Sequence, residues 1–246
     1  MDLALKQRFT ERWAAYFPGA ELPVGLYYTG EVERAEPARP RGRSCLICDL
    51  APVRQGRSLQ FDVETVGCPG GRRYLGFVPD LPPDIEHFLS CGIPGGREGE
   101  RYKQSPELVK KVMGQMPPFE APGRTIVFKR WDRMAADDEP AVVVFFAPPD
   151  VLSGLFTLAG YDEADLEAVI APFSSGCGSI VYHPYRELEA ERPRAVLGMF
   201  DVSARPCVPA DVLTLAVPWP KFVRMVANMD ESFLITGAWR KVRARL

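Results

Sequence analysis

The chain contains little histidine, no surplus of charge of either sign and no long apolar run. Only two of its 246 residues are histidine, so few imidazoles are present for metal ligation or acid–base catalysis. The formal net charge is −2, which gives no electrostatic reason to bind a nucleic-acid backbone. No apolar stretch approaches the roughly 20 residues that a membrane-spanning helix needs. We therefore expect neither nucleic acid nor membrane among the partners of this protein.

The sequence also begins without the unbroken apolar segment of a secretory signal. Residues 3–17 interleave apolar and charged side chains, a pattern that is typical of an amphipathic helix. We therefore expect a soluble, cytoplasmic protein whose six cysteines are mostly reduced. A local basic cluster, Arg39, Arg41 and Arg43, is predicted to be a solvated loop.

Proline is abundant, at 24 residues, and it divides the chain into short elements. The expected helices cover residues 3–17, 45–55, 84–90, 105–116, 149–159, 163–170 and 220–229, and the expected strands cover 24–28, 59–66, 125–131, 141–147, 195–200 and 212–217. An acidic turn separates the third and fourth strands, which predicts that these two form a hairpin. The fold class expected from this pattern is α+β, with helices flanking a mixed or antiparallel sheet.

The same order of signals occurs twice along the chain. Residues 24–28 match 142–146, 67–68 match 176–177, 75–76 match 197–198, and 106–112 match 220–226. The alternative is that short strands and proline-started helices recur in any protein of this class. We predict two diverged repeats, residues 1–135 with the N-terminal helix and residues 136–246, packed about a pseudo-twofold axis into one compact unit. In this interpretation Cys68 and Cys177 occupy equivalent positions and face one cleft.

The cysteines are the main candidates for chemistry. Cys45 and Cys48 form a C-x-x-C, Cys68 precedes Pro-Gly-Gly, and Cys177 lies in Ser-Ser-Gly-Cys-Gly-Ser. Thiolates are soft ligands for zinc and for iron–sulfur clusters, and adjacent glycines let backbone N–H groups approach the sulfurs. We predict a zinc or iron–sulfur site held by Cys48, Cys68 and Cys177, with Cys45 as a further ligand.

Other interpretations of the cysteines remain open. The chain has no second C-x-x-C, so the first one is also consistent with a redox dithiol. Cysteines are also small buried hydrophobes, and we expect Cys91 and Cys207, which lie in contexts flanked by proline or glycine, to serve only in packing. The first functional hypothesis is a thiolate-ligated binding or redox protein, with a small molecule or a redox partner.

Two further hypotheses do not require a metal. A metal-free protein would bind an anionic metabolite between the repeats through Arg205, at a strand end, and Tyr102, in a basic segment before a helix. A salt bridge from Arg205 to Asp201 explains that arginine equally well. An enzyme would use Cys177 as a nucleophile and His183, six residues later, as a base.

Several motifs resemble the domain of unknown function 169 family over nearly the whole chain. They are Cys-Pro-Gly-Gly at 68–71, Leu-Gly-Phe at 75–77, Gly-Glu-Arg-Tyr at 99–102, Phe-Ser-Ser-Gly-Cys at 173–177, Leu-Gly-Met-Phe-Asp at 197–201, Ala-Arg-Pro at 204–206, Ala-Asn-Met at 227–229 and Glu-Ser-Phe at 231–233. The resemblance implies a protein of anaerobic and other prokaryotes. It also implies that the Cys68 and Cys177 motifs belong to the family pattern, with Cys45 or Cys48 as the upstream cysteine. It implies no activity.

Overall fold

One mixed sheet runs through the protein. The structure, a computed structural model, describes residues 1–30, 34–39, 42 and 44–246. Within these residues the sheet has eight strands in the order β2-β3-β4-β1-β5-β8-β7-β6. The strands are β1 Val24–Thr29, β2 Glu36–Pro37, β3 Ser58–Phe61, β4 Thr125–Arg130, β5 Val142–Ala147, β6 Val169–Ile170, β7 Ala195–Gly198 and β8 Leu213–Pro218. The expected mixture of helices and strands is confirmed.

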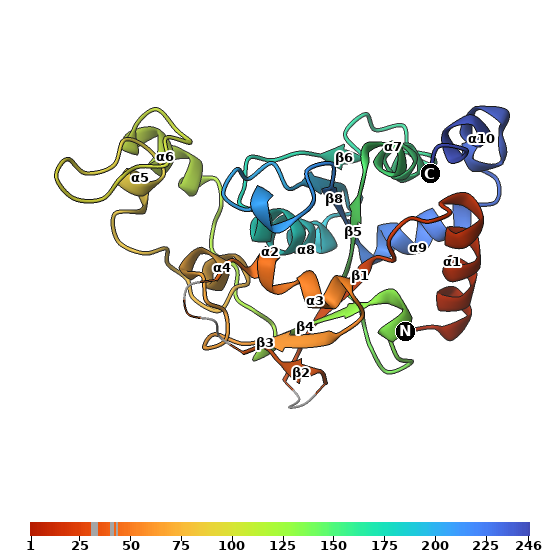
Figure 1. Ribbon diagram of the computed structural model, residues 1–246, viewed down its shortest axis with the longest axis horizontal. Helices are drawn as coiled ribbons and strands as arrows, with labels where there is room; N and C mark the ends of the chain where they lie inside the picture. Colours follow the sequence, from red (N-terminus) through yellow and green to blue (C-terminus); the bar gives the residue numbers. More distant parts are fainter. Residues whose placement is uncertain (31–33, 40–41, 43) are drawn as a thin grey trace.

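Helices cover both faces of this sheet. The helices are α1 Leu3–Tyr16, α2 Leu46–Asp49, α3 Ala51–Arg54, α4 Pro69–Tyr74, α5 Ile85–Phe88, α6 Pro106–Gly114, α7 Pro149–Ala159, α8 His183–Arg186, α9 Trp219–Asn228 and α10 Gly237–Arg243. In Figure 1, α1, α7, α9 and α10 lie to the right of β5, and α2, α3, α4 and α8 lie to its left. No helix of the described residues is both long enough and apolar enough to cross a membrane.

Successive side chains of the central strands point to opposite faces of the sheet, and each face has its own apolar core. In β5, Val142 and Val144 belong to the core beneath α2, α4 and α8, whereas Val143 and Phe145 belong to the core beneath α1, α7 and α9. Successive side chains of a strand point to opposite faces, so an unbroken apolar strand indicates that both faces are covered. The first of these two cores contains Cys177, and Cys45 and Cys207 pack against it.

The strand order is the same on both sides of the central pair, β1 and β5. Outward from β1 lie β4, β3 and β2, and outward from β5 lie β8, β7 and β6. Both sides contain two antiparallel pairs followed by a parallel one. Val24 pairs with Val144, and Leu26 pairs with Val142, as a twofold axis between Gly25 and Val143 requires. Descent of the two halves from one ancestral unit stays a prediction, with its boundary at residues 135 and 136 between β4 and β5.

The observed strand order changes which segments of the two predicted repeats are equivalent. Cys68 follows β3, but Cys177 precedes β7, so these two cysteines do not occupy matching positions in the sheet. Cys45, between β2 and β3, is the positional counterpart of Cys177, between β6 and β7. Of the four pairs of segments that match in the sequence, only residues 24–28 and 142–146 lie on equivalent strands, β1 and β5.

Other expectations from the sequence were also wrong. The predicted hairpin does not form, because β1 lies between β4 and β5 and pairs with both. Residues 163–170 do not form the predicted helix, and Val169–Ile170 forms the short strand β6. Two residues of the predicted basic loop, Arg41 and Arg43, lie outside the described part of the chain.

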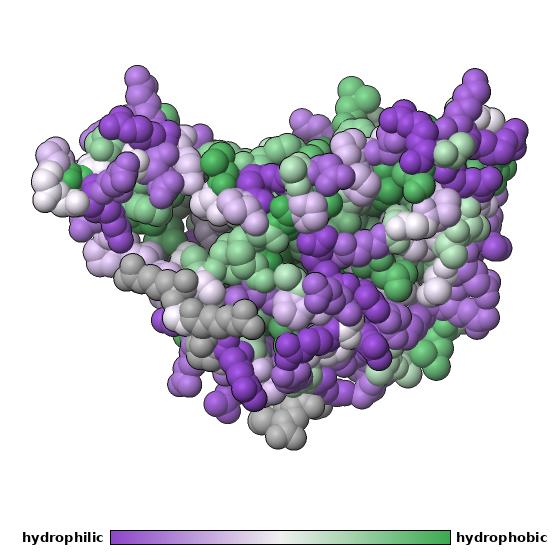
Figure 2. Space-filling view, viewed as in Figure 1, coloured by the Kyte–Doolittle hydropathy of each residue, from purple (hydrophilic) through white to green (hydrophobic). Residues whose placement is uncertain are grey.

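A small lobe projects from the body of the protein. It carries α5 and α6 and lies at the upper left of Figure 1, joined to the body by two connecting segments. Figure 2 shows the same lobe standing off the main mass of the molecule. Ser105 starts α6 as predicted, because its hydroxyl accepts a hydrogen bond from the N–H of Leu108 and Pro106 occupies the first turn.

Candidate functional site

Three free cysteines each precede a helical segment on the same side of the sheet. Cys45 precedes α2, Cys68 precedes α4, and Cys177 precedes the short π-helical segment η2, Gly178–Tyr182. Cys177 is 7% exposed and belongs to the core of this face, and Cys45 packs against that core. Each of the three arrives from a different part of the chain, so the fold alone brings them together.

Hydrogen-bond donors approach each of these sulfurs. The N–H of Gly71 donates to Cys68 Sγ at 3.4 Å. Burial raises the pKa of Cys45, and the backbone N–H groups of Ile47 and Cys48 lower it in part. Cys177 Sγ lies 3.2 Å from Ser175 Oγ. Donors of this kind stabilise the thiolate form of a cysteine.

The thiols also oppose one another's ionisation. Burial raises the pKa of Cys177, and the nearby Cys68, Cys45 and Asp201 raise it further, against a lowering hydrogen bond from Ser175. Burial is the largest cause that raises the pKa of Cys45, and Cys68 and Asp201 add to it. Mutual repulsion of this kind requires that the acidic groups be close together. At neutral pH, Cys45 and Cys177 are therefore neutral thiols.

The loop after β7 borders this cluster in a constrained conformation. Asp201 accepts hydrogen bonds from the N–H of Gly176 at 2.9 Å and from the hydroxyl of Ser203 at 2.7 Å. Met199 is buried and has a φ of 67°, in the left-handed region that a side chain rarely adopts. A side chain at Gly176 would lie 2.9 Å from Ile47 and 3.3 Å from the sulfur of Met199. The glycine before Cys177 is therefore required by close packing of the two loops.

Cys48 and Cys207 form a disulfide across 159 residues. This corrects the expectation that Cys207 serves only in packing; the other four cysteines, Cys45, Cys68, Cys91 and Cys177, are free thiols. While the disulfide is present, Cys48 has no thiolate to offer a metal. Its formation also ties α2 to the loop after β7, so it fixes the position of Cys45 relative to Asp201.

The family model DUF169, described as an uncharacterised ArCR, matches residues 20–228. The chain belongs to this family. No curated protein and no solved structure matched the chain. The matched range contains all three thiols and the disulfide, so the candidate site of this DUF169 protein lies entirely within the family domain.

The predicted anion-binding residues of the DUF169 protein differ in their surroundings. The Arg205 guanidinium donates to the carbonyls of Pro209, Ala210 and Val212, so it closes its own loop and does not pair with Asp201. Tyr102 lies near Ser203 and Asp201 of the loop after β7. Burial raises its pKa, and Glu100 and Asp201 raise it further.

Among the described residues, no group of three or more histidine, cysteine, aspartate or glutamate side chains is arranged to hold a metal ion. The three thiols are near enough to influence one another but are not drawn into a coordination shell. The site predicted from the sequence did not include Asp201 and Met199, which lie in the Leu-Gly-Met-Phe-Asp motif at 197–201. That motif was the available signal, since it also carried the family resemblance.

Proposed function

We propose that this protein binds a thiophilic metal, as an iron–sulfur cluster or as zinc, through Cys45, Cys68 and Cys177. The observation that carries the proposal is the convergence of three free, electrostatically coupled thiols from separate segments. Thiolates are the preferred ligands of both zinc and iron–sulfur clusters. This ligand set omits Cys48 of the sequence-based prediction, because Cys48 is bonded to Cys207, and it keeps Cys45, which was predicted as a further ligand.

The raised pKa values support binding of a cation. Acidic groups that repel one another when ionised are stabilised as anions when a positive ion lies between them. Binding would release protons from the Cys45 and Cys177 thiols, so the affinity should increase with pH. The N–H donors at Cys45 and Cys68 would remain as partners of the metal-bound sulfurs.

Binding would also require the sulfurs to approach one another. Three protein ligands leave one position of a four-coordinate site open for a small molecule. Reduction of the Cys48–Cys207 disulfide would supply a further thiolate one helical turn from Cys45.

The test is metal analysis of protein purified without oxygen, and of protein reconstituted either with iron and sulfide or with zinc. We expect bound metal in the native protein and loss of most of it in Cys45→Ser, Cys68→Ser and Cys177→Ser. Cys91→Ser is the matched control, because Cys91 is free, exposed and located in the lobe. A well-folded protein that stays metal-free under all these conditions would overturn the proposal, as would equal losses in Cys91→Ser.

A further inference from the structure

A cavity of about 680 Å³ lies where the α5–α6 lobe joins the body. Its walls come from the end of α4, from residues 79–86, from the last turn of α6 and from residues 116–118. These segments include both connections between the lobe and the body (Figure 1). The volume is in the range of sites for small molecules.

Arg73 is the cation in the wall of this cavity. It is 7% exposed, and one of its terminal nitrogens, Nη2, donates to the carbonyl of Met116 at 2.9 Å. The guanidinium also lies 5.8 Å from the centre of the Tyr182 ring, whose hydroxyl is fixed by the carbonyl of Pro117 at 2.7 Å. The second terminal nitrogen, Nη1, is buried without a hydrogen-bond partner in the described residues.

A buried guanidinium without a counterion is costly. Buried charges in proteins are normally paired, and an unpaired one lowers stability. Among the described residues, no carboxylate forms an ion pair with Arg73, although Asp80, Asp84 and Glu86 all line the same cavity. A buried cation without a carboxylate partner, in the wall of a cavity of this size, is the arrangement that binds a carboxylate.

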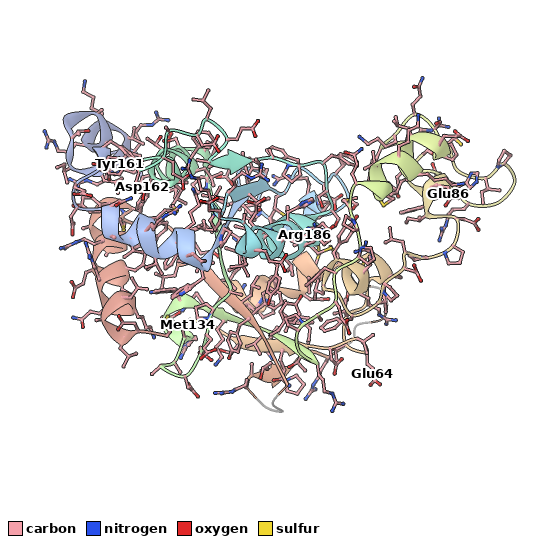
Figure 3. The ribbon with its side chains drawn as sticks, turned by 180° about the vertical axis from the view of Figure 1, so that it is seen from behind. Glu64, Glu86, Met134, Tyr161, Asp162 and Arg186 are labelled. Atoms are coloured by element: carbon pink, nitrogen blue, oxygen red, sulfur yellow. A yellow bond between two sulfur atoms is a disulfide. The ribbon has the colours of Figure 1, made fainter. Side chains whose placement is uncertain are left out.

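The carboxylates of the cavity lie apart from Arg73, on the segment that leads into the lobe. Glu86, in the lobe (Figure 3), is paired with Lys110 at 3.2 Å. Asp84 is exposed and has a φ of 61°, and its carboxylate does not cap α5, which it precedes. Strained residues of this kind concentrate at ligand sites. Asp80 is also exposed, so two carboxylates are accessible at the lobe side of the cavity.

We propose that this cavity binds a small zwitterion, with its carboxylate on Arg73 and its ammonium group toward Asp80 and Asp84. The class of ligand is an amino acid or an ω-amino acid. The apolar wall, which includes Tyr74, Met113 and several prolines, suits the hydrocarbon part of such a molecule. The proposal concerns a site separate from the thiols and does not depend on metal binding.

The test measures binding by calorimetry to the free amino acids and to three ω-amino acids, β-alanine, 4-aminobutyrate and 5-aminovalerate. Propionate, butyrate and valerate are the matched probes without the ammonium group. We expect the native protein to bind at least one zwitterion and to prefer it to its matched carboxylate. Arg73→Met should weaken binding roughly tenfold or more, because it removes one partner of a buried charge pair. Asp84→Asn should reduce the preference for the zwitterion.

A measurement of thermal stability separates a binding role from a structural one. The zwitterion that binds should raise the unfolding temperature of the native protein, and Arg73→Met should lose that rise. The control is Arg192→Met, at an exposed arginine, which should leave both binding and stability unchanged. Failure of every probe to bind at millimolar concentration would overturn the proposal. Binding that Arg73→Met does not weaken, or a ligand-induced rise in unfolding temperature that this variant keeps, would overturn it equally.

Discussion

The thiol of Cys177 is protected both from solvent and from ionisation. It is 7% exposed, and burial together with the neighbouring acidic groups raises its pKa. A nucleophilic cysteine needs the opposite environment, because the thiolate is the reactive form. His183 is only a weak base, because burial and Arg186 lower its pKa to about 4. The surroundings of Cys177 and His183 therefore disfavour attack of this cysteine on a substrate.

Alkylation rates should follow these pKa differences. At pH 7 we expect iodoacetamide to modify the exposed Cys91 first, and Cys45 and Cys177 slowly, because the raised pKa values keep these two thiols protonated. Their rates should increase as the pH is raised toward 10. Mass spectrometry of peptides from a time course gives the order of modification, and Cys91→Ser should lack the first phase. Modification of Cys177 ahead of Cys91 at pH 7 would instead support a cysteine nucleophile.

At the scale of single elements, the sequence predicted those whose signals are local. The amphipathic pattern predicted α1, and Ser105-Pro106 predicted the start of α6, since capping depends on neighbouring residues alone. The supposed hairpin of β4 and β5 failed because β1, about a hundred residues earlier in the chain than β4, inserts between them. No local rule indicates such an insertion.

The candidate site could be predicted only in part, because some of its contacts also join distant parts of the chain. Glycine-flanked cysteines are visible in the sequence, so Cys68 and Cys177 were identified, and Cys45 was included as a further ligand. The disulfide between Cys48 and Cys207 depends on a contact across 159 residues, and that contact exists only in the folded chain. The unpaired nitrogen of Arg73 is likewise a property of the fold, because Arg72 and Arg73 are indistinguishable by type.

Two helical glycines should respond in opposite ways to the same substitution. Gly154 lies within α7, and a Cβ there would stand 2.4 Å from the Trp239 ring of α10 and 2.9 Å from the Phe17 ring. Gly154→Ala should therefore destabilise the protein by about 1–3 kcal/mol through overpacking. A Cβ at Gly114, the last residue of α6, would meet no neighbouring group within 4 Å, so Gly114→Ala should stabilise by about 0.4–1 kcal/mol. Urea unfolding of both variants measures the difference, and a stabilising Gly154→Ala would contradict the packing of α7 on α10.

At the scale of the whole molecule, the two predicted repeats share one sheet and the helical layers on both of its faces. The N-terminal helix α1 packs with residues near the other end of the chain: Arg12 pairs with Asp230 at 2.6 Å, and the indole of Trp239 donates to the carbonyl of Tyr16 at 2.9 Å. The core beneath α1 combines Phe9 of the first half with aromatic residues of the second. Each half therefore depends on the other for burial of its apolar surface.

Separation of the halves should consequently abolish folding of both. A fragment of residues 1–135 would expose β1 along the edge that pairs with β5, and it would leave the apolar face of α1 uncovered. A fragment of residues 136–246 would expose the matching edge of β5. Such long apolar edges promote aggregation. We expect neither fragment alone to show a cooperative thermal transition by circular dichroism, and co-expression of the two to restore one transition. A cooperative transition in either fragment alone would show instead that the repeats are independent domains, with the β1–β5 pair as an interface between them.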